Sequence, residues 1–392
     1  MKPSHLPSDW RQAPLSSVAD VQTGLALGKS SKVDPVRLPY LRVANVQDGF
    51  LDLSVIKEVE VERSQVFRYS LRQGDVLLTE GGDFDKLGRG FIWHDEIPNC
   101  LHQNHIFVVR PHAQLLSYFL AALTSSDYGR SYFQSCSKQS TNLASINSSQ
   151  LKAFPVPLPD IREQKAITAV ISTWDQGIRQ LTDLIEAKVR FKQGLMQQLL
   201  AGKRRFPEFG EPTNSLHEPP RGWQRIKAGE VFGNYSQKAN DGEELLSVTQ
   251  DRGVIPRSML EGRVVMPESG TDGYKLVEPG DFVISLRSFQ GGLEYSKFRG
   301  LVSPAYTVLK SRRVINDAFF RHYFKSYDFI QRLAVAVIGI RDGKQISYSD
   351  FEFVRLPYPP LAEQERIANV IDVADREIDG GLKSQKQSRL RN

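Results

Sequence analysis

The sequence of 392 residues has few of the features expected of a secreted or membrane-embedded protein. It contains only two cysteines, Cys100 and Cys136, which cannot form a disulfide framework and which fit a reducing compartment. No stretch approaches about 18 uninterrupted apolar residues, and the first ten residues, MKPSHLPSDW, lack the apolar core of a signal peptide. We therefore expect a soluble cytoplasmic protein without membrane contact.

The motifs of common enzymes are also missing. Gly28-Lys29-Ser30 resembles the end of a phosphate-binding loop, but the required upstream glycine position is Thr23, with Gly24 one residue too close. Neither a Gly-x-Ser-x-Gly elbow, a His-Glu-x-x-His pair, a Gly-x-Gly-x-x-Gly loop nor the Asn/Asp-Pro-Pro-aromatic motif of amino-methyltransferases occurs. Five residues could be imagined as a metal site, although their spacing matches no zinc pattern: His94, Cys100, His102, His105 and Cys136. We expect no catalytic residues, no metal and no cofactor in this chain.

A long helix is predicted between Pro155 and Gly202. Asp160 lies at the N-cap position, with Glu163 three residues later as in a capping box, and this role explains the Asp160, Glu163 and Lys165 set better than a nuclease site does. Gly202 and the basic residues after it suit the C-terminus of a helix. The length of about forty residues corresponds to a rod of roughly 60 Å. Its apolar residues step by four and three, the heptad seam of a helix that packs lengthwise on a partner: Ile167, Ile171, Trp174, Ile178, Leu181 and Ile185.

The beginning of this helix occurs twice. The segment 158–167, LPDIREQKAI, is matched 200 positions later by 358–367, YPPLAEQERI, and Val170-Ile171 is matched by Val370-Ile371. Trp10 and Trp223 near the start of each half, and Gly74-Asp75 and Gly280-Asp281 before strand-like runs, extend the correspondence. The chain is therefore interpreted as a tandem duplication. The second helix would present Ile367, Ile371 and Ile378 on its seam and be shorter and interrupted at Gly380-Gly381.

Each half is predicted to be a small α+β or mostly β unit that is closed by a long helix. In the first half we expect strands at 38–46, 74–79 and 106–110 and one helix near 113–132, and in the second half strands at 245–249, 282–286 and 306–309 and one helix near 317–335. The resulting fold class is α+β, with two tandem globular domains separated by two long antiparallel coiled-coil helices and a pseudo-two-fold relation. The expected boundaries are 1–156, 157–205, 206–357 and 358–392.

The residues of the two helix starts carry a resemblance to a known family. Leu-Pro-x-Ile-x-Glu-Gln-x-x-Ile, followed by a helix that ends Gly-Leu-Met-Gln-Gln-Leu-Leu-x-Gly at 194–202, resembles the specificity subunit of type I restriction–modification systems, and the likeness covers essentially the whole chain. The resemblance implies two DNA target-recognition domains on a coiled coil that holds two DNA adenine methyltransferase subunits and, through them, restriction and translocase subunits. S-adenosylmethionine, and ATP with Mg²⁺ for the nuclease, would then bind in those partners.

Double-stranded DNA is the expected ligand, and the net charge of +6 favours such a polyanion. Polar and basic loop residues next to the strands are the candidates for contacts to bases and phosphates. Two other hypotheses remain, a coiled-coil adaptor that does not bind DNA and a methyltransferase or restriction enzyme in its own right. The candidate DNA-binding residues are Lys86, Arg89, Gln103, Asn104, Lys138, Gln139, Thr141 and Asn142 in the first half and Arg287, Ser288, Gln290, Arg341, Lys344 and Gln345 in the second.

Overall fold

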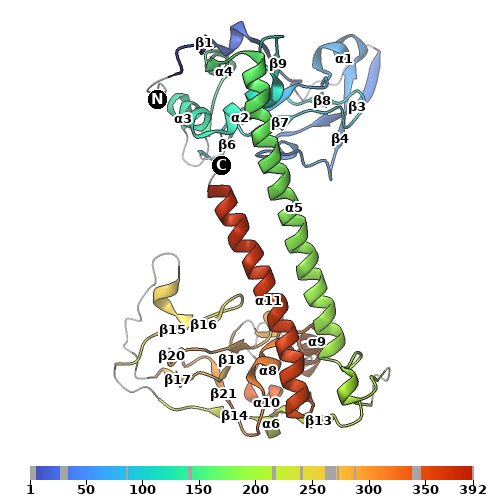
Figure 1. Cartoon of the computed structure of the whole chain (residues 1–392), viewed down its shortest axis with the longest axis vertical. Helices are drawn as coiled ribbons and strands as arrows, with labels where there is room; N and C mark the ends of the chain where they lie inside the picture. Colours follow the sequence, from blue (N-terminus) through green and yellow to red (C-terminus); the bar gives the residue numbers. More distant parts are fainter. Residues whose placement is uncertain are drawn as a thin grey trace. The chain divides into compact units, whose positions relative to one another are not determined.

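The computed structural model describes residues 6–26, 34–84, 87–139, 144–213, 218–238, 242–260, 271, 273–286, 288–337 and 346–390. These residues form two compact units, unit 1 at Met1–Gly177 and unit 2 at Ile178–Asn392. Each unit combines small sheets with helices, so the α+β prediction is confirmed (Figure 1). None of the described helices is long and apolar enough to cross a membrane.

Unit 1 is built on a four-stranded antiparallel sheet with the strand order β2-β9-β5-β7, where the strands span Ala19–Thr23, Ile106–Pro111, Val76–Thr79 and Gly90–Ile92. A second sheet has the order β4-β3-β8, at Lys57–Glu62, Pro35–Leu41 and Leu101–His102, and the helix α1, Arg63–Tyr69, directly follows β4. Short strands join distant segments: β1, Arg11–Pro14, pairs with β12, Pro155–Leu158, and β10, Lys138–Gln139, pairs with β11, Ala144–Ser145, which pairs with β6, Gly81–Gly82.

Unit 2 repeats this plan. Its four-stranded sheet has the order β14-β21-β18-β19, at Phe232–Tyr235, Thr307–Ser311, Phe282–Ile284 and Glu294–Tyr295. The remaining strands form three pairs. β13 (Gln224–Lys227) pairs with β22 (Arg355–Tyr358), and β15 (Leu246–Thr249) pairs with β16 (Gly253–Pro256). β17 (Lys275–Val277) pairs with β20 (Gly300–Val302). Three short helices accompany them, α6 at Ala228–Val231, α7 at Ser288–Gly291 and α10 at Tyr348–Phe351.

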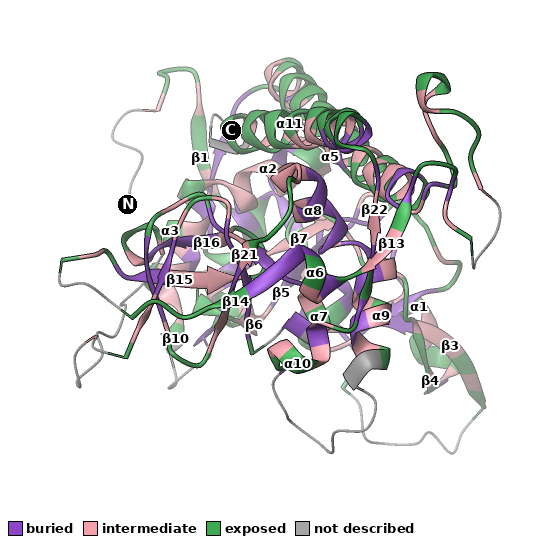
Figure 2. Cartoon of the chain, turned by 90° about the horizontal axis from the view of Figure 1, so that it is seen from below, coloured by how far each residue is buried: buried purple, intermediate pink, exposed green. Residues whose placement is uncertain are grey.

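Where the sequence predicted a single helix in each half, the structure has two consecutive helices. In unit 1, α2 at Ser117–Ser125 is followed by α3 at Asp127–Cys136, and in unit 2, α8 at Asp317–Tyr323 is followed by α9 at Tyr327–Val337. The break comes from a serine in the same place in both units. Ser126 Oγ accepts the N–H of Gly129 and Ser326 Oγ accepts the N–H of Phe329, so each hydroxyl caps the second helix. Helix α8 is largely buried (purple in Figure 2). A further short helix, α4 at Ser148–Lys152, precedes β12 in unit 1.

The Gly-Asp pairs that precede β5 and β18 form equivalent turns. Gly74 and Gly280 have φ of 88° and 99°, which favour glycine. In each turn the next residue is an aspartate whose carboxylate accepts the N–H three positions earlier, Asp75 from Arg72 and Asp281 from Glu278, both at 2.8 Å. The correspondence inferred from the sequence therefore has the same local structure in both units.

The long central helix α5 spans Ile161–Leu199, close to its predicted bounds, and Gly202 follows with φ of 69°. Asp160 Oδ1 accepts the N–H of Glu163 at 2.9 Å, which confirms the N-cap. The capping-box role of Glu163 is wrong, because its side chain accepts a hydrogen bond from Trp10 instead. The predicted strand at 38–46 is also too long: β3 ends at Leu41, and Asn45 accepts the N–H of Arg42 in a 3-10 turn.

The distal helix α11 runs without interruption over Leu361–Leu390, so the break predicted at Gly380-Gly381 is wrong. The described span of α11 is 30 residues, and that of α5 is 39. Within unit 2 the two helices are antiparallel, because Thr182, Lys188 and Lys192 bond in turn to Gln385, Glu377 and Asp375. A Cβ on Gly381 would lie 2.9 Å from Ile185 Cγ1, so this glycine permits the close approach of the helices.

Candidate nucleic-acid interface

The start of α11 in unit 2 is fixed by a buried ion pair. Arg205, which follows α5, donates from Nε and Nη2 to the two carboxylate oxygens of Glu363 at 2.8 Å, and both side chains are almost fully buried. Trp223, which precedes β13, donates its indole N–H to the same carboxylate at 2.8 Å. These three residues, the unit 2 anchor, join three segments of the chain within unit 2.

The equivalent anchor of unit 1 has only two members. Trp10 donates its indole N–H to Glu163 at 3.1 Å, and its ring packs edge-on against Phe119. Both Trp10 and Glu163 are half-buried, whereas Trp223 and Glu363 are buried. Among the described residues no cation pairs with Glu163, so the unit 1 anchor, Trp10 and Glu163, lacks the counterpart of Arg205.

The glutamine after each of these acids performs the same task in both units. Gln164 accepts the N–H of Leu116 and donates to the carbonyl of Pro159, both at 2.9 Å. Gln364 accepts the N–H of Asn316 at 2.9 Å and donates to the carbonyl of Pro359 at 2.8 Å. Each repeated Glu-Gln pair therefore attaches the long helix to the fold beside it: the acid bonds to a tryptophan, and the amide bonds to the segment that enters the α2 or α8 helix.

In unit 1 the structure brings together three loops that were predicted to contact DNA. Glu80 N–H donates to the carbonyl of His105 at 3.0 Å, and His105 Nδ1 lies 2.6 Å from Glu80 Oε2, which joins the loop after β5 to the loop before β9. The pairing of β6 with β11 and of β11 with β10 then places Lys138 in the same three-stranded sheet as Gly81-Gly82, with β11 between them. The polar loops of unit 1 thus form one surface at the end of β5.

The candidate residues on this surface are accessible. Arg89, Gln103 and Asn104 are half-buried, and Lys138 is exposed. Phe84, which was not among the candidates, is 42% exposed in the same loop as Arg89, and its aromatic ring offers a surface for stacking on a base. Gln139 lies in β10 next to Lys138. Lys86, Thr141 and Asn142 lie outside the described residues, as does Gly28-Lys29-Ser30.

In unit 2 the described part of the candidate surface is smaller. Gln290 is exposed on α7. Ser288 is buried, and its hydroxyl accepts the N–H of Ser285 at 2.8 Å, so it shapes the turn after β18 and is not presented to a ligand. Beside α7, Lys325 Nζ bonds to Glu294 at 2.6 Å, and burial raises the pKa of that carboxyl. Arg287, Arg341, Lys344 and Gln345 lie outside the described residues.

The residues considered for a zinc site have other partners. His102 and Cys100 are buried, His102 Nδ1 bonds to the carbonyl of Tyr69 at 3.0 Å, and His105 pairs with Glu80. Burial lowers the pKa of His102 to about 4 and raises that of Cys100 to about 12. His94 lies beside Tyr118, and the Cys136 thiol contacts the carbonyl of Phe133. These arrangements provide no shared set of metal ligands.

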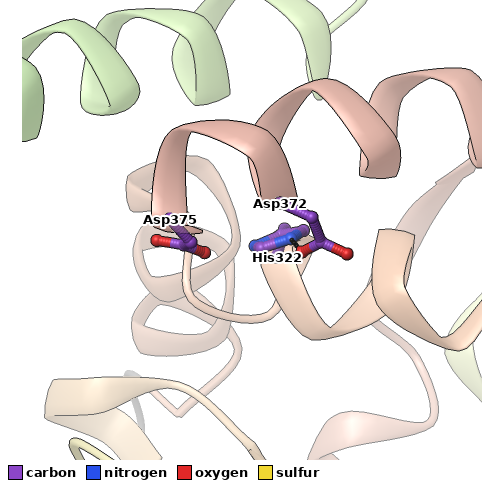
Figure 3. Close-up of side chains that lie close together, drawn as sticks. All are labelled: His322, Asp372 and Asp375. Atoms are coloured by element: carbon purple, nitrogen blue, oxygen red, sulfur yellow. Dashed lines mark hydrogen bonds and ion pairs between the residues drawn. The ribbon is translucent and has the colours of Figure 1, made fainter. Parts of the chain in front are cut away.

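A different cluster, His322, Asp372 and Asp375, has ligand atoms within 4.8 Å of one another (Figure 3). Its two acids are already neutralised. Asp372 accepts from His322 at 2.6 Å and is also paired with Arg321, and Asp375 pairs with Lys192 at 2.5 Å. Burial lowers the pKa of His322. The cluster therefore links α8, α11 and α5 within unit 2 as an ion-pair network, and a cation would have to displace Lys192 and Arg321.

The seam residues of the long helices are not equally covered. Ile185, Ile367 and Ile371 are buried, whereas Ile178 and Leu181 are half-buried. Ile167 packs partly against the core of unit 1, but Ile171 and Trp174 remain 37% and 48% exposed. Ile378 is half-exposed. The heptad pattern thus corresponds to a covered face in unit 2 and to an open face in unit 1.

The anchors are the residues that the sequence interpretation missed. Trp10, Trp223 and the Glu-Gln pairs were recognised as repeated, but no bond between them was predicted. The hydrogen bonds join residues 153 and 140 positions apart, and no local pattern encodes such a distance. The only signal in the sequence was the recurrence of the same two residue types at both ends of each half.

Comparisons with known proteins find similarity to specificity subunits of type I restriction enzymes. The model of the type I restriction modification DNA specificity domain matches residues 7–189. The putative type I restriction enzyme MjaX specificity subunit of Methanocaldococcus jannaschii is 25% identical, over 97% of this chain and 90% of its own length. The EcoKI specificity subunit of Escherichia coli is 23% identical, over 95% and 83%.

Two solved structures have a similar fold. A chain from work on the complex assembly and conformational transition of the type I R-M system superposes with a TM-score of 0.63 at 18% identity, covering 99% of this chain and 96% of its own. The S subunit of the type I system of M. genitalium superposes with a TM-score of 0.53 at 14% identity, covering 98% and 95%.

Proposed function

This chain belongs to the specificity subunits of type I restriction–modification systems, and from that premise we propose that it selects a bipartite, asymmetric DNA target, one half with each unit. In this proposal the chain itself neither methylates nor cleaves DNA. Two DNA methyltransferase subunits bind to it, restriction and translocase subunits join through them, and S-adenosylmethionine, ATP and Mg²⁺ bind in those partners.

The observation that carries the proposal is the contrast between the anchors and the loops. Both units attach to their long helices through the same tryptophan, glutamate and glutamine bonds. The polar groups near the ends of β5 and β18 differ: in unit 1 Glu80 is bonded to His105, whereas in unit 2 Lys325, which follows α8, is bonded to Glu294 of β19 and to the carbonyl of Gly291 in α7. A shared attachment with different polar loops is the arrangement expected of two domains that recognise different bases.

The site in unit 1 can be tested with single substitutions. Arg89→Ala and Lys138→Ala should each weaken binding of the full chain, assembled with its methyltransferase, to target DNA, by about fivefold to a hundredfold if the side chain binds a base. If the side chain binds a phosphate, the substitution should instead lower the salt slope of binding by about one. Arg162→Ala, an exposed arginine at the start of α5, is the matched control and should change neither quantity.

The readout that distinguishes the alternatives is the map of methylated adenines. A substitution that removes a base-reading side chain from unit 1 should relax one half of the target and leave the other half unchanged. Binding that is equally weak for all sequences and insensitive to salt would support the adaptor hypothesis. Methylation by the lone chain with S-adenosylmethionine would contradict the assignment of catalysis to a partner.

A further inference from the structure

Unit 2 contains a cavity of about 360 Å³, part of it open to solvent, with a basic lining. Three of the lining side chains are arginines, Arg225, Arg332 and Arg355, and Asp328 is the one acid among the described residues that line it. Asp328 is already neutralised, because it accepts hydrogen bonds from Arg332 Nε at 2.8 Å and from the Tyr323 hydroxyl at 3.1 Å. Three arginines against one aspartate leave two positive charges unbalanced.

The two remaining arginines are held close together by the strand pair β13 and β22. In the antiparallel register Arg225 lies opposite Pro357 and Arg355 lies opposite Lys227, so both arginines occupy the same face of the pair as diagonal neighbours. Diagonal positions are about 7–8 Å apart, within the reach of long side chains. Among the described residues neither guanidinium pairs with a carboxylate. Such a concentration of like charge is unfavourable unless an anion lies between the two groups.

The rest of the cavity lining is largely apolar and fixed by packing. Tyr323 and Trp223 are 1% and 5% exposed. Pro220 packs on the turn after α5, where a Cβ on Gly202 would overlap its Cγ. The arginines therefore line a recess with rigid, poorly polarisable walls, and such surroundings strengthen the attraction between a guanidinium and an anion.

Unit 1 has neutral residues at the equivalent strand positions. Its strand pair β1 and β12 has the same register, and Gln12 and Pro155 stand where unit 2 has Arg225 and Arg355. The two arginines are therefore not part of the attachment that both units share.

The helix beside the strands differs in the same way. Counted from the serine that caps each helix, Tyr128 and Tyr132 of α3 correspond to Asp328 and Arg332 of α9. Both tyrosine rings of unit 1 pack against Phe154, and their hydroxyls donate to backbone carbonyls at 2.7 and 2.8 Å. Unit 1 thus has bonded aromatic groups at the positions where unit 2 has the charged lining of the cavity.

We propose that this cavity of unit 2 binds a dianionic phosphate, as the free ion or as the monoester of a small molecule, between Arg225 and Arg355. A guanidinium fork matches two oxygens of a phosphate group. A phosphate monoester carries a charge of about −1.5 to −2 at pH 7, which balances the two unpaired arginines, whereas each phosphodiester of a DNA backbone carries a single charge. The cavity volume lies at the lower end of the range for small-ligand sites. The site is independent of target recognition by the polar loops.

The probe is inorganic phosphate, titrated by calorimetry into the full-length chain without DNA and compared with sodium chloride at equal ionic strength. We expect saturable one-to-one binding that raises the thermal unfolding midpoint. Arg225→Gln, which introduces the residue found in unit 1, and Arg355→Ala should each weaken binding by about tenfold or more, because each removes a charge-assisted pair. Arg376→Ala is the matched control: Arg376 is exposed on α11 and does not line the cavity, so this variant should bind as the unaltered chain does.

A variant with the opposite expected effect separates binding from loss of folding. Asp328→Asn releases Arg332 from its ion pair but keeps an oxygen for the Tyr323 hydroxyl, so phosphate should bind about tenfold more tightly. No saturable binding by the unaltered chain, equal binding by Arg225→Gln, or weaker binding by a folded Asp328→Asn would overturn the proposal.

Two further ligands identify the source of the phosphate. Phenyl phosphate is a simple monoester: tighter binding than that of inorganic phosphate would assign the site to a monoester whose organic group contacts Trp223, and weaker binding would assign it to the free ion. Duplex DNA without a target sequence should leave the bound phosphate in place. Displacement of phosphate by this duplex would overturn the proposal, because a backbone phosphodiester would then be the occupant.

Discussion

Both units contain a hydrogen bond from a tryptophan to a glutamate, but this bond is buried in unit 2 and only half-buried in unit 1. In unit 2 the indole of Trp223 and the guanidinium of Arg205 enclose the carboxylate of Glu363, and all three are buried. In unit 1 the indole of Trp10 reaches Glu163 alone, at a half-exposed surface. The bond from tryptophan to glutamate is thus present in both units, and in unit 2 the arginine adds a buried charge pair to it.

The strongest test of this comparison removes each acid in turn. Glu363→Ala leaves Arg205 buried without its partner and should lower the free energy of unfolding of unit 2 by about 3–5 kcal/mol. Glu163→Ala removes one hydrogen bond at a half-exposed site and should cost unit 1 about 1 kcal/mol. Hydrogen exchange measured separately for α2 and α8 resolves the two units. Equal destabilisation of both would contradict the difference in burial.

Aspartate substitutions can likewise compare a buried and an exposed position of the seam on α5. Ile185 is 8% exposed, so Ile185→Asp should cost about 3 kcal/mol and loosen the pairing of α5 with α11 in unit 2. Trp174 is 48% exposed, and Trp174→Asp should cost the isolated chain less than about 1 kcal/mol. Thermal unfolding and hydrogen exchange of α11 provide the measurement, and a larger effect at Trp174 would mean that this face is already covered.

Acid should weaken the two units unequally. Burial lowers the pKa of His102 in unit 1 to about 4, whereas in unit 2 the lowering of the pKa of His322 by burial is opposed by its hydrogen bond to Asp372. Because the unfolded chain binds this proton below about pH 6.5 and the folded chain does not, stability falls as the pH drops from about 6.5 to 4, by about 3 kcal/mol in total. His102→Gln should remove this part of the pH dependence, as followed by urea unfolding at several pH values. An unchanged slope would contradict the burial of a neutral imidazole.

The smallest expected effect compares two adjacent glycines of α11. A Cβ on Gly380 would meet nothing within 4 Å, so Gly380→Ala should raise stability by about 1 kcal/mol through helix propensity. A Cβ on Gly381 would lie 2.9 Å from Ile185, so Gly381→Ala should lose that gain or become destabilising. Thermal unfolding of the two variants is sufficient. A gain at both positions would show that α5 does not approach α11 closely at Gly381.

The sequence could predict features that depend on neighbouring residues, but not those that depend on contacts between distant segments. The start and end of α5 follow from Asp160 and Gly202, which act on their immediate neighbours, and these predictions are confirmed. The helix breaks at Ser126 and Ser326 were missed because a serine is compatible with either a helix interior or an N-cap until its tertiary context is known. The interruption at Gly380-Gly381 was wrong for the same reason: packing against Ile185 outweighs the low helix propensity of glycine.

The candidate site, too, was predictable only where the relevant signal is local in the sequence. Local composition identified the polar loops around Arg89, Asn104 and Lys138, and the fold gathers them at the end of β5. It could not exclude Ser288, because burial of that hydroxyl depends on the turn after β18. Nor could it find Phe84 as an exposed ring or the anchors as bonded groups, since these features depend on bonds and exposure that only the folded chain defines. Which of the loop residues contact bases stays a prediction.

The central claim is that the two units recognise separate halves of one DNA target, and an exchange of one unit tests it most directly. Residues 1–156 are replaced by the matching unit of a related specificity subunit, and the chimaera is assembled with the methyltransferase. Sequencing of methylated adenines should then show new bases in one half of the target and the original bases in the other, because the side chains that specify bases act locally within each unit. If both halves changed, or if neither did, the assignment of one half to each unit would be wrong.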